Sequence, residues 1–277
     1  MSVSSSEQRS RGIAARATQQ RISSARREVV GVWRITALVA IVALCSAQPL
    51  AAQRNAGNGF LFREPEGSFQ IRAGYSGANA SSDLFAFTTD QLTLNKSSFS
   101  GATIGAEFSF RIAPQLDLSF SADYAGVSPR SEFRHLVDQD NQPIEQTTEF
   151  RRVPLIASMR AYLTPRGRSI GHFVWIPSKF TPWVEAGGGF TWFQFRQQGD
   201  FVDFKTNDVF TATSEANGWA PSASGAVGGD ISLNARLALT GAARYTYAKG
   251  TLSSDFTGFN NLDLSGVSTT VGLTVRF

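Results

Sequence analysis

The chain has 277 residues, of which 42 % are hydrophobic and only 17 % are charged. This excludes a disordered chain, and 25 Gly, 22 Phe and only 2 Met argue against a helical bundle or coiled coil. The net charge of +4 does not indicate a nucleic-acid partner, because residues 1–34 alone hold seven Arg and two Glu, and the remainder is slightly acidic. The composition favours a β-rich chain.

A leader is predicted over residues 1–52. A basic segment ends at Arg34, and the thirteen uncharged residues 35–47 follow it. This run is shorter than the roughly 20 apolar residues of a spanning helix, so it is typical of a signal peptide rather than a membrane anchor. Cleavage is expected after Ala47, Ala52 or Gln53. A lipoprotein site at Cys45 is disfavoured by the bulk of Leu44, and loss of the leader would leave a mature chain without a thiol.

Residues 53–67 predict an irregular periplasmic lead-in, and residues 68–277 predict an outer-membrane β-barrel. The signal is alternation of apolar and polar residues, seen most clearly in 116–124, where five apolar residues alternate with four polar ones. The eight predicted strands span 68–75, 99–111, 116–124, 148–163, 181–195, 220–233, 236–247 and 264–277. Most are long enough to cross a bilayer as tilted strands, which takes about 9–11 residues.

The predicted connections alternate in length. Long segments follow every second strand, at about 76–98, 125–147, 196–219 and 248–263, and the turns after the second and sixth strands are short. Long external loops and short periplasmic turns are typical of outer-membrane barrels. The exception is 164–180, a predicted turn of seventeen residues. A soluble β-sandwich also shows alternation, so the choice depends on which face is charged.

Charges lie on the polar face of the predicted strands, and aromatic residues lie near the ends of the apolar face. A charge facing lipid costs roughly 2–4 kcal/mol, so we expect the polar face to line the lumen. The predicted lumen charges are Arg72, Glu107, Arg111, Asp117, Asp123, Arg152, Arg160, Glu185, Asp230, Arg244 and Arg276. The predicted interfacial girdles are Tyr75, Tyr124, Trp192, Tyr245 and Tyr247 at one end, and Phe110 and Phe277 at the other. The sequence thus predicts a closed, all-β, antiparallel up-and-down barrel of eight strands in a membrane.

Together, the leader, the eight strands, the loop pattern and the last residue, Phe277, resemble the small outer-membrane barrels of the OmpA, OmpX and OmpW type. The final strand, with Leu273, Val275 and Phe277 at alternate positions, is similar to the signal read by the outer-membrane assembly machinery. The resemblance implies the outer membrane of a Gram-negative-type bacterium as the location, with the lipid bilayer and that machinery as partners. It does not fix the function, because the family includes adhesins, small pores and lipid enzymes.

Enzymatic chemistry is not expected. His135 lies near Ser131 in a predicted loop, but no short His–Ser motif of a lipid hydrolase is visible. Asp138 and Asp140 alternate like cation ligands without the glycine of a calcium loop. We therefore predict no catalytic residue, no metal and no cofactor.

The segment 164–180 is cationic and aromatic and contains no acid. We interpret it as a periplasmic interface patch, formed by Arg166, Arg168, His172, Trp175 and Lys179. One interpretation is an interfacial anchor, with aromatic residues at the acyl boundary and cations at lipid phosphates. The alternative is a docking patch for a periplasmic partner.

Two functions remain open. Phe residues recur in the external loops, in sets that include Leu84, Phe85 and Phe87; Phe201, Phe204 and Phe210; and Phe256 and Phe259. They would serve a surface ligand, extend the strands, or fold over the barrel mouth. The first hypothesis is a structural or surface-interaction barrel, because eight strands leave room only for side chains. The alternative is a narrow conduit for small hydrophobic solutes, suggested by Pro154, Ile156, Trp183 and Phe193 on the lumen face and by space at Gly187 and Gly189.

Overall fold

The computed structural model describes residues 61, 63–137, 141–170, 174–202 and 209–277. The predicted leader, 1–52, and most of the predicted lead-in lie outside these residues. Eight strands form a barrel wall: β1 (Gly67–Ala78), β2 (Gly101–Ala113), β3 (Leu116–Val127), β5 (Pro143–Tyr162), β8 (Phe180–Val202), β9 (Val209–Ser232), β10 (Leu237–Gly250) and β12 (Gly266–Arg276).

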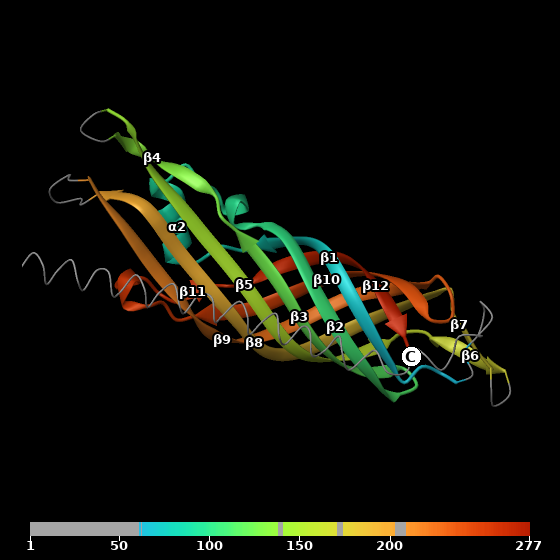
Figure 1. Ribbon diagram of the computed structural model, residues 1–277. Helices are drawn as coiled ribbons and strands as arrows, with labels where there is room; N and C mark the ends of the chain where they lie inside the picture. Colours follow the sequence, from blue (N-terminus) through green and yellow to red (C-terminus); the bar gives the residue numbers. More distant parts are fainter. Residues whose placement is uncertain (1–60, 62, 138–140, 171–173, 203–208) are drawn as a thin grey trace, which may run out of the picture. The chain divides into compact units, whose positions relative to one another are not determined.

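Each wall strand pairs with the next in antiparallel register, and β12 pairs with β1 from Ser68 opposite Arg276 to Ala78 opposite Gly266. This last pairing closes the sheet, as Figure 1 shows. The predicted eight-stranded antiparallel barrel is therefore confirmed. Among the described residues, no helix has the length and apolarity that a membrane crossing requires.

The two faces of the wall have opposite character. Apolar side chains point outward, and Ile71, Phe190 and Val271 are 56 %, 59 % and 58 % exposed. Polar residues between them point inward and are buried, as Arg72 and Glu107 are. An outward apolar surface of this kind is stable in lipid. Because lipid offers no hydrogen-bond partners, closure of the sheet is needed to pair the backbone N–H and C=O groups of every strand.

Aromatic residues mark both edges of the apolar belt. Tyr75, Tyr124, Trp219, Tyr245 and Tyr247 are exposed at one end, and Phe110 and Phe277 are exposed at the other. Trp192 on β8 is paired directly with Trp219 on β9. We call the first end the loop end and the second the turn end.

Six wall strands reach past their predicted limits at the loop end, and three of them, β5, β8 and β9, do so by the largest margins. The predicted limits at 148, 195 and 220 are wrong, because β5 begins at Pro143, β8 ends at Val202 and β9 begins at Val209. A further strand, β4 (Arg130–Val137), pairs with β5, so the predicted loop 125–147 is largely a hairpin. We call residues 130–137, 143–152, 193–202 and 209–218 the strand extension; it projects at the left of Figure 1.

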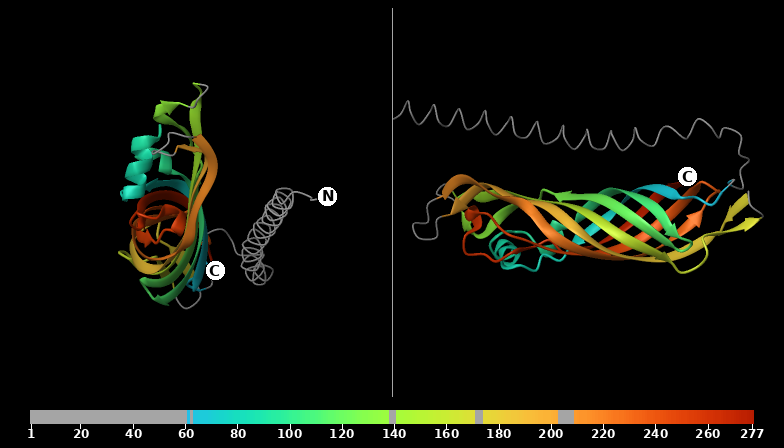
Figure 2. Two further views of the ribbon diagram at one scale, coloured as in Figure 1. Left: turned by 90° about the vertical axis from the view of Figure 1, so that its left-hand side faces the viewer. Right: turned by 90° about the horizontal axis from the view of Figure 1, so that it is seen from below.

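The other loop-end connections carry short helices. Between β1 and β2 lie α2 (Asp83–Gln91) and the 3-10 helix η2 (Lys96–Phe99). Between β10 and β12 lie η3 (Ser254–Phe256) and the short strand β11 (Leu262–Asp263). Viewed end-on, α2 lies against one side of the strand extension (Figure 2, left). These connections are thus ordered against the wall rather than freely extended.

At the turn end, the connections after β2 and β9 are short, as predicted. The long segment 164–180 folds into a hairpin of β6 (Gly167–Ile170) and β7 (Val174–Pro177), seen at the right of Figure 1. The backbone of Leu61 pairs with Trp175 of this hairpin. The segment before β1 is therefore anchored at the turn end.

Candidate functional site

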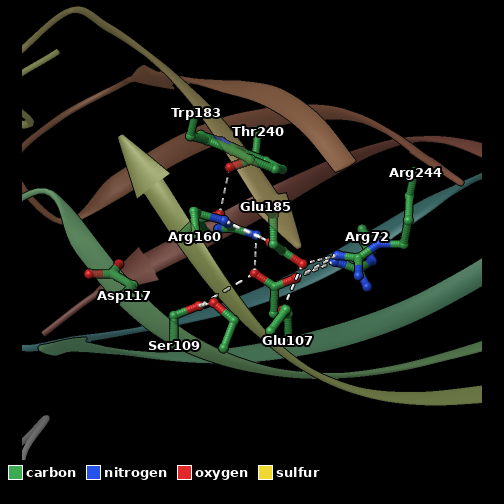
Figure 3. Close-up of polar contacts among 12 residues, drawn as sticks. Arg72, Glu107, Ser109, Asp117, Arg160, Trp183, Glu185, Thr240 and Arg244 are labelled. Carbon is green, nitrogen blue, oxygen red and sulfur yellow. Dashed lines mark hydrogen bonds and ion pairs between the residues drawn. The ribbon is translucent and has the colours of Figure 1, made fainter. Parts of the chain in front are cut away.

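An ion cluster fills the middle of the lumen, built around Glu107 on β2 (Figure 3). Arg72 Nη1 donates to Glu107 Oε2 at 2.6 Å, and Arg244 Nη2 lies 3.2 Å from the same oxygen. Arg160 donates to Glu107 Oε1. These side chains are between 1 % and 6 % exposed, so one carboxylate holds three buried arginines.

Two further carboxylates balance the charge of this cluster. Glu185 Oε2 accepts from Arg160 at 2.6 Å, and its Oε1 lies 2.8 Å from Arg244. Asp123 accepts from Arg72 at 2.8 and 2.7 Å, one bond to each oxygen. The Arg160 guanidinium also stacks 3.9 Å from the centre of the Trp183 ring. Removal of any one member would leave a buried charge uncompensated.

A second set of polar contacts closes the turn end. Arg166 Nη1 donates to both oxygens of Asp117 at 3.0 Å, and the Tyr162 hydroxyl donates to Asp117 at 3.1 Å. Glu64, from the segment before β1, pairs with Arg111. The other predicted lumen charges at this end, Arg276 and Asp230, lie 3.7 Å apart. The turn end of the lumen is therefore bridged by side chains.

The predicted periplasmic patch is divided by the structure. Arg166 points into the barrel at Asp117, as described above, because a buried carboxylate needs a cationic partner. Trp175 is only 2 % exposed, since it packs against Leu61 and Ala235 rather than against lipid. Arg168 and Lys179 are exposed, and His172 lies outside the described residues.

An apolar plug fills the loop end of the lumen. Phe85 on α2 contacts Phe99, Phe150 and Phe195 with ring centroids 4.6, 5.2 and 5.7 Å apart, all edge-on. Phe256 of η3 packs on Phe195 at 5.6 Å. The buried members of the plug are Ala80, Leu84, Phe85, Leu92, Leu94, Phe99, Phe150, Phe193, Phe195, Ala216, Ala220, Ala248, Phe256, Leu262 and Leu264.

The loop aromatics therefore have more than one role. Leu84, Phe85 and Phe256 fold over the barrel mouth, which was one of the three predicted roles. Phe201 and Phe210 extend the strands and stack with centroids 6.1 Å apart. The exposed Phe87 pairs with Phe259 at 5.5 Å on the outer surface. Phe204 lies outside the described residues.

Carboxylates latch the two loops of the plug together. Asp263 accepts from the Ser81 backbone at 3.2 Å and from the Ser265 backbone at 3.0 Å, and Asp83 accepts from the backbone and side chain of Asn260 at 2.9 Å. Burial alone would raise the pKa of Asp263, but hydrogen bonds from the side chains and backbone amides of Ser81 and Ser265 outweigh burial and hold its pKa below the ordinary value. The latch is therefore strongest when Asp263 is ionised.

The space predicted at Gly187 and Gly189 is absent. A Cβ on Gly187 would collide with the backbone of Ala157 and Ser158, and one on Gly189 would collide with the Leu155 carbonyl oxygen. These glycines permit close packing of β8 on β5 and leave no channel. Ile156, Trp183 and Phe193 do face the lumen, as expected, but each is at most 3 % exposed.

The residues considered for catalysis are not brought together into a catalytic arrangement. The Ser131 hydroxyl donates to the Gln146 carbonyl oxygen at 3.3 Å, whereas His135 is exposed on β4. Asp138 and Asp140 lie outside the described residues. Within the described ranges, no group of three His, Cys, Asp or Glu side chains is placed to hold a metal.

The final strand occupies the seam of the barrel. Leu273 and Phe277 face outward and are 47 % and 48 % exposed, and the Phe277 ring lies 5.7 Å from that of Phe108. The backbone carbonyl oxygen of Phe277 accepts from Gly67 at 3.0 Å. The C-terminal residue thus completes the closure between β12 and β1.

Several solved outer-membrane proteins are similar to this chain over most of its length. OprG from Pseudomonas aeruginosa is 16 % identical, with a TM-score of 0.43, and the match covers 78 % of this chain and 99 % of that one. Neisserial surface protein A is 14 % identical, with a TM-score of 0.42 and coverages of 76 % and 97 %. Ail of Yersinia pestis is 11 % identical, with a TM-score of 0.38 and coverages of 78 % and 100 %.

No family model and no curated protein matches the sequence. The strand pairing, the closed wall and the lipid-facing belt described above define the class by themselves. The chain is a transmembrane antiparallel β-barrel whose wall has eight strands.

Proposed function

We propose that this barrel acts through its outer surface, in a structural or surface-interaction role, and does not conduct solutes. In this proposal the leader directs export through the inner membrane and is removed. The barrel then lies in the outer membrane of a Gram-negative-type bacterium, with the loop end outward. Leu273, Val275 and Phe277 serve as the assembly signal.

The observation that supports this proposal is obstruction of the lumen at three levels. Side chains bridge it at the turn end through Arg166 and Asp117, in the middle around Glu107, and at the loop end through the plug. Among the described lumen residues, the space that remains between the ion cluster and the plug is a cavity of about 40 Å³. A cavity of that size holds a few waters and no hydrophobic solute.

The surface that remains available lies on the strand extension. Its outer face carries many polar residues beside the exposed Val137 and Phe210. The register places Arg196 between Glu149 and Glu215, and Gln194 between Arg151 and Asn217. About ten residues of each long strand continue past the aromatic girdle, or ~30 Å along the strand. Such a surface stands clear of the membrane and suits contact with a macromolecule or with neighbouring surface sugars.

At the turn end, we propose a lipid anchor rather than a docking patch. Arg168 and Lys179 are exposed beside the apolar Leu163, Ile170 and Phe180, each more than half exposed. Cations next to an apolar belt favour phosphates at the bilayer boundary. Deletion of 167–177 should then weaken retention in anionic lipid vesicles.

The experiment compares cells that lack the protein with cells complemented by variants. In one variant a two-residue Asn-Gly turn connects Gln197 directly to Ser214, its partner on β9. This removes the tip of the β8–β9 hairpin and keeps Phe195 in the plug. We expect this variant to reach the membrane folded and to leave small-solute uptake unchanged. It should fail to restore the attachment of cells to surfaces, or the vancomycin resistance that reports an intact outer membrane, whichever of the two the intact protein restores. A protein whose absence alters only solute uptake would refute the proposal and favour the conduit.

A further inference from the structure

Arg152 differs from every other arginine that points into the described lumen. Arg72, Arg160, Arg166, Arg244 and Arg276 each have a carboxylate oxygen within 4.0 Å. Arg152, 7 % exposed on β5, has none within that distance among the described residues. It lies where the ion cluster meets the plug, since it borders both Arg244 and Leu264.

The contacts of Arg152 are to neutral groups. Its Nη1 donates to the Leu264 carbonyl oxygen at 2.9 Å, and its Nη2 donates to the Ser76 hydroxyl at 3.1 Å. The guanidinium also lies 5.1 Å from the centre of the Phe150 ring. These partners satisfy hydrogen bonds but supply no negative charge, and a buried charge without a counter-charge is costly.

The carboxylate that most favours the charge on Arg152 is Asp263. Asp263 makes no ion pair with Arg152, and its oxygens are held by Ser81 and Ser265. Its attraction therefore acts at longer range and compensates Arg152 only in part.

Beside Arg152 lies the cavity of about 40 Å³. Its polar lining includes Ser76, Thr103, Asp123, Arg152, Thr191, Arg244, Thr246 and Ser268. Thr191 is 2 % exposed, and its hydroxyl has no hydrogen-bond partner. A buried, unpartnered hydroxyl on the wall of a cavity is an available donor. Arg244 is paired with Glu107 and Glu185, and Asp123 is paired with Arg72, so Arg152 alone brings an uncompensated charge to this cavity.

We propose that this cavity binds a small monovalent anion of the chloride class. Arg152 supplies the uncompensated positive charge, and the Thr191 hydroxyl donates a hydrogen bond. A cation fits poorly, because both oxygens of Asp123 already accept from Arg72. Water alone would fill the volume and leave the charge of Arg152 uncompensated.

The test is anion-specific stabilisation of the refolded barrel in neutral detergent. The starting salt is sodium gluconate, whose anion is too large for the cavity. It is replaced stepwise by sodium chloride or sodium bromide at constant ionic strength. Chloride at tenfold its dissociation constant should lower the unfolding equilibrium constant about elevenfold, and the effect should continue to grow with the logarithm of the chloride concentration. Equal stability in chloride and gluconate would overturn the proposal.

Two variants locate the site. Thr191→Val should raise the chloride dissociation constant that is fitted to the stability data, and Thr181→Val is its matched control. Thr181 is also buried with an unpartnered hydroxyl but does not line the cavity, so its response should equal that of the wild type. Arg152→Met should abolish the response if it folds. An unchanged chloride dissociation constant in Thr191→Val, together with no bromide peak at Arg152 in anomalous diffraction, would contradict the proposal.

Discussion

The strands β5, β8 and β9 have opposite patterns on the two sides of the aromatic girdle. On the turn-end side of the girdle, Val184 and Phe190 of β8 point outward and Glu185 points inward. On the loop-end side, Arg196 of the same strand points outward and Phe195 points inward, into the plug. The pleat continues without interruption, so the inside and outside of one sheet exchange polarity within a few residues.

The difference shows that the surroundings decide which residues are buried. In lipid the apolar face is outward, and the core of the barrel is held by ion pairs. Past the girdle the outer face meets water, and the core is held by aromatic packing in the ordinary way. The barrel therefore has two cores, one polar and one apolar, and variants in each should have separable effects.

The largest effect is expected from Glu107→Gln, in the polar core. The change leaves Arg72, Arg160 and Arg244 with a carboxylate too few, and loss of one partner of a buried pair costs roughly 3–5 kcal/mol. Urea unfolding of the refolded barrel, followed by heat-dependent gel mobility, should show it. Asp200→Asn, on the exposed strand extension, is the neutral control. A Glu107 variant as stable as that control would mean that the cluster does not hold the barrel.

In the apolar core, Phe85→Ala should loosen the plug and spare the wall. Truncation of a buried phenylalanine costs about 3 kcal/mol or more, and Phe85 lies on α2 rather than on a wall strand. Trypsin cleavage after the exposed Lys96 should therefore accelerate about a hundredfold. Heat-dependent mobility should remain that of the wild type. Loss of the whole barrel in this variant would show that the two cores are one cooperative unit.

Acidification should weaken the plug latch and leave the wall folded. The folded pKa of Asp263 lies below the ordinary 3.8, so its contribution is complete above that pH and is lost as the pH falls through the folded value. The plug loops should therefore lose protection progressively as the pH falls below 3.8. Hydrogen exchange of residues 79–100, corrected for intrinsic rates, should report it. Asp263→Asn should remove the pH dependence; if the variant keeps the wild-type profile, another group is responsible.

The smallest effect is expected from Arg196→Ala on the outer face of the strand extension. Arg196 lies half-buried opposite Glu149 and Glu215 without a described ion pair to either, and cross-strand pairs of this kind contribute roughly 0.2–1 kcal/mol. Urea unfolding should therefore place it close to the wild type, in contrast with the arginines of the ion cluster. A loss of 3 kcal/mol or more would remove the distinction between the two sides of the girdle.

The wall and its two faces could be predicted from the sequence. Apolar and polar residues alternate along strands that cross lipid, and the charged residues identify the face that points away from lipid. The ends of β5, β8 and β9 could not, because the prediction ended each strand where outward residues stopped being apolar. The inverted pattern past Trp192, with Phe193 and Phe195 at inward positions, was the available signal. The pairing of Arg166 with Asp117 joins distant segments, so composition alone assigned Arg166 to a surface.

The central claim is that the lumen is sealed, and single-channel conductance tests it most directly. The purified mature barrel is refolded, shown to be folded by heat-dependent gel mobility, and inserted into a planar bilayer. The account predicts a silent bilayer at all voltages that the membrane withstands. Reproducible unitary steps from the wild-type protein would contradict it and would make transport the function to pursue.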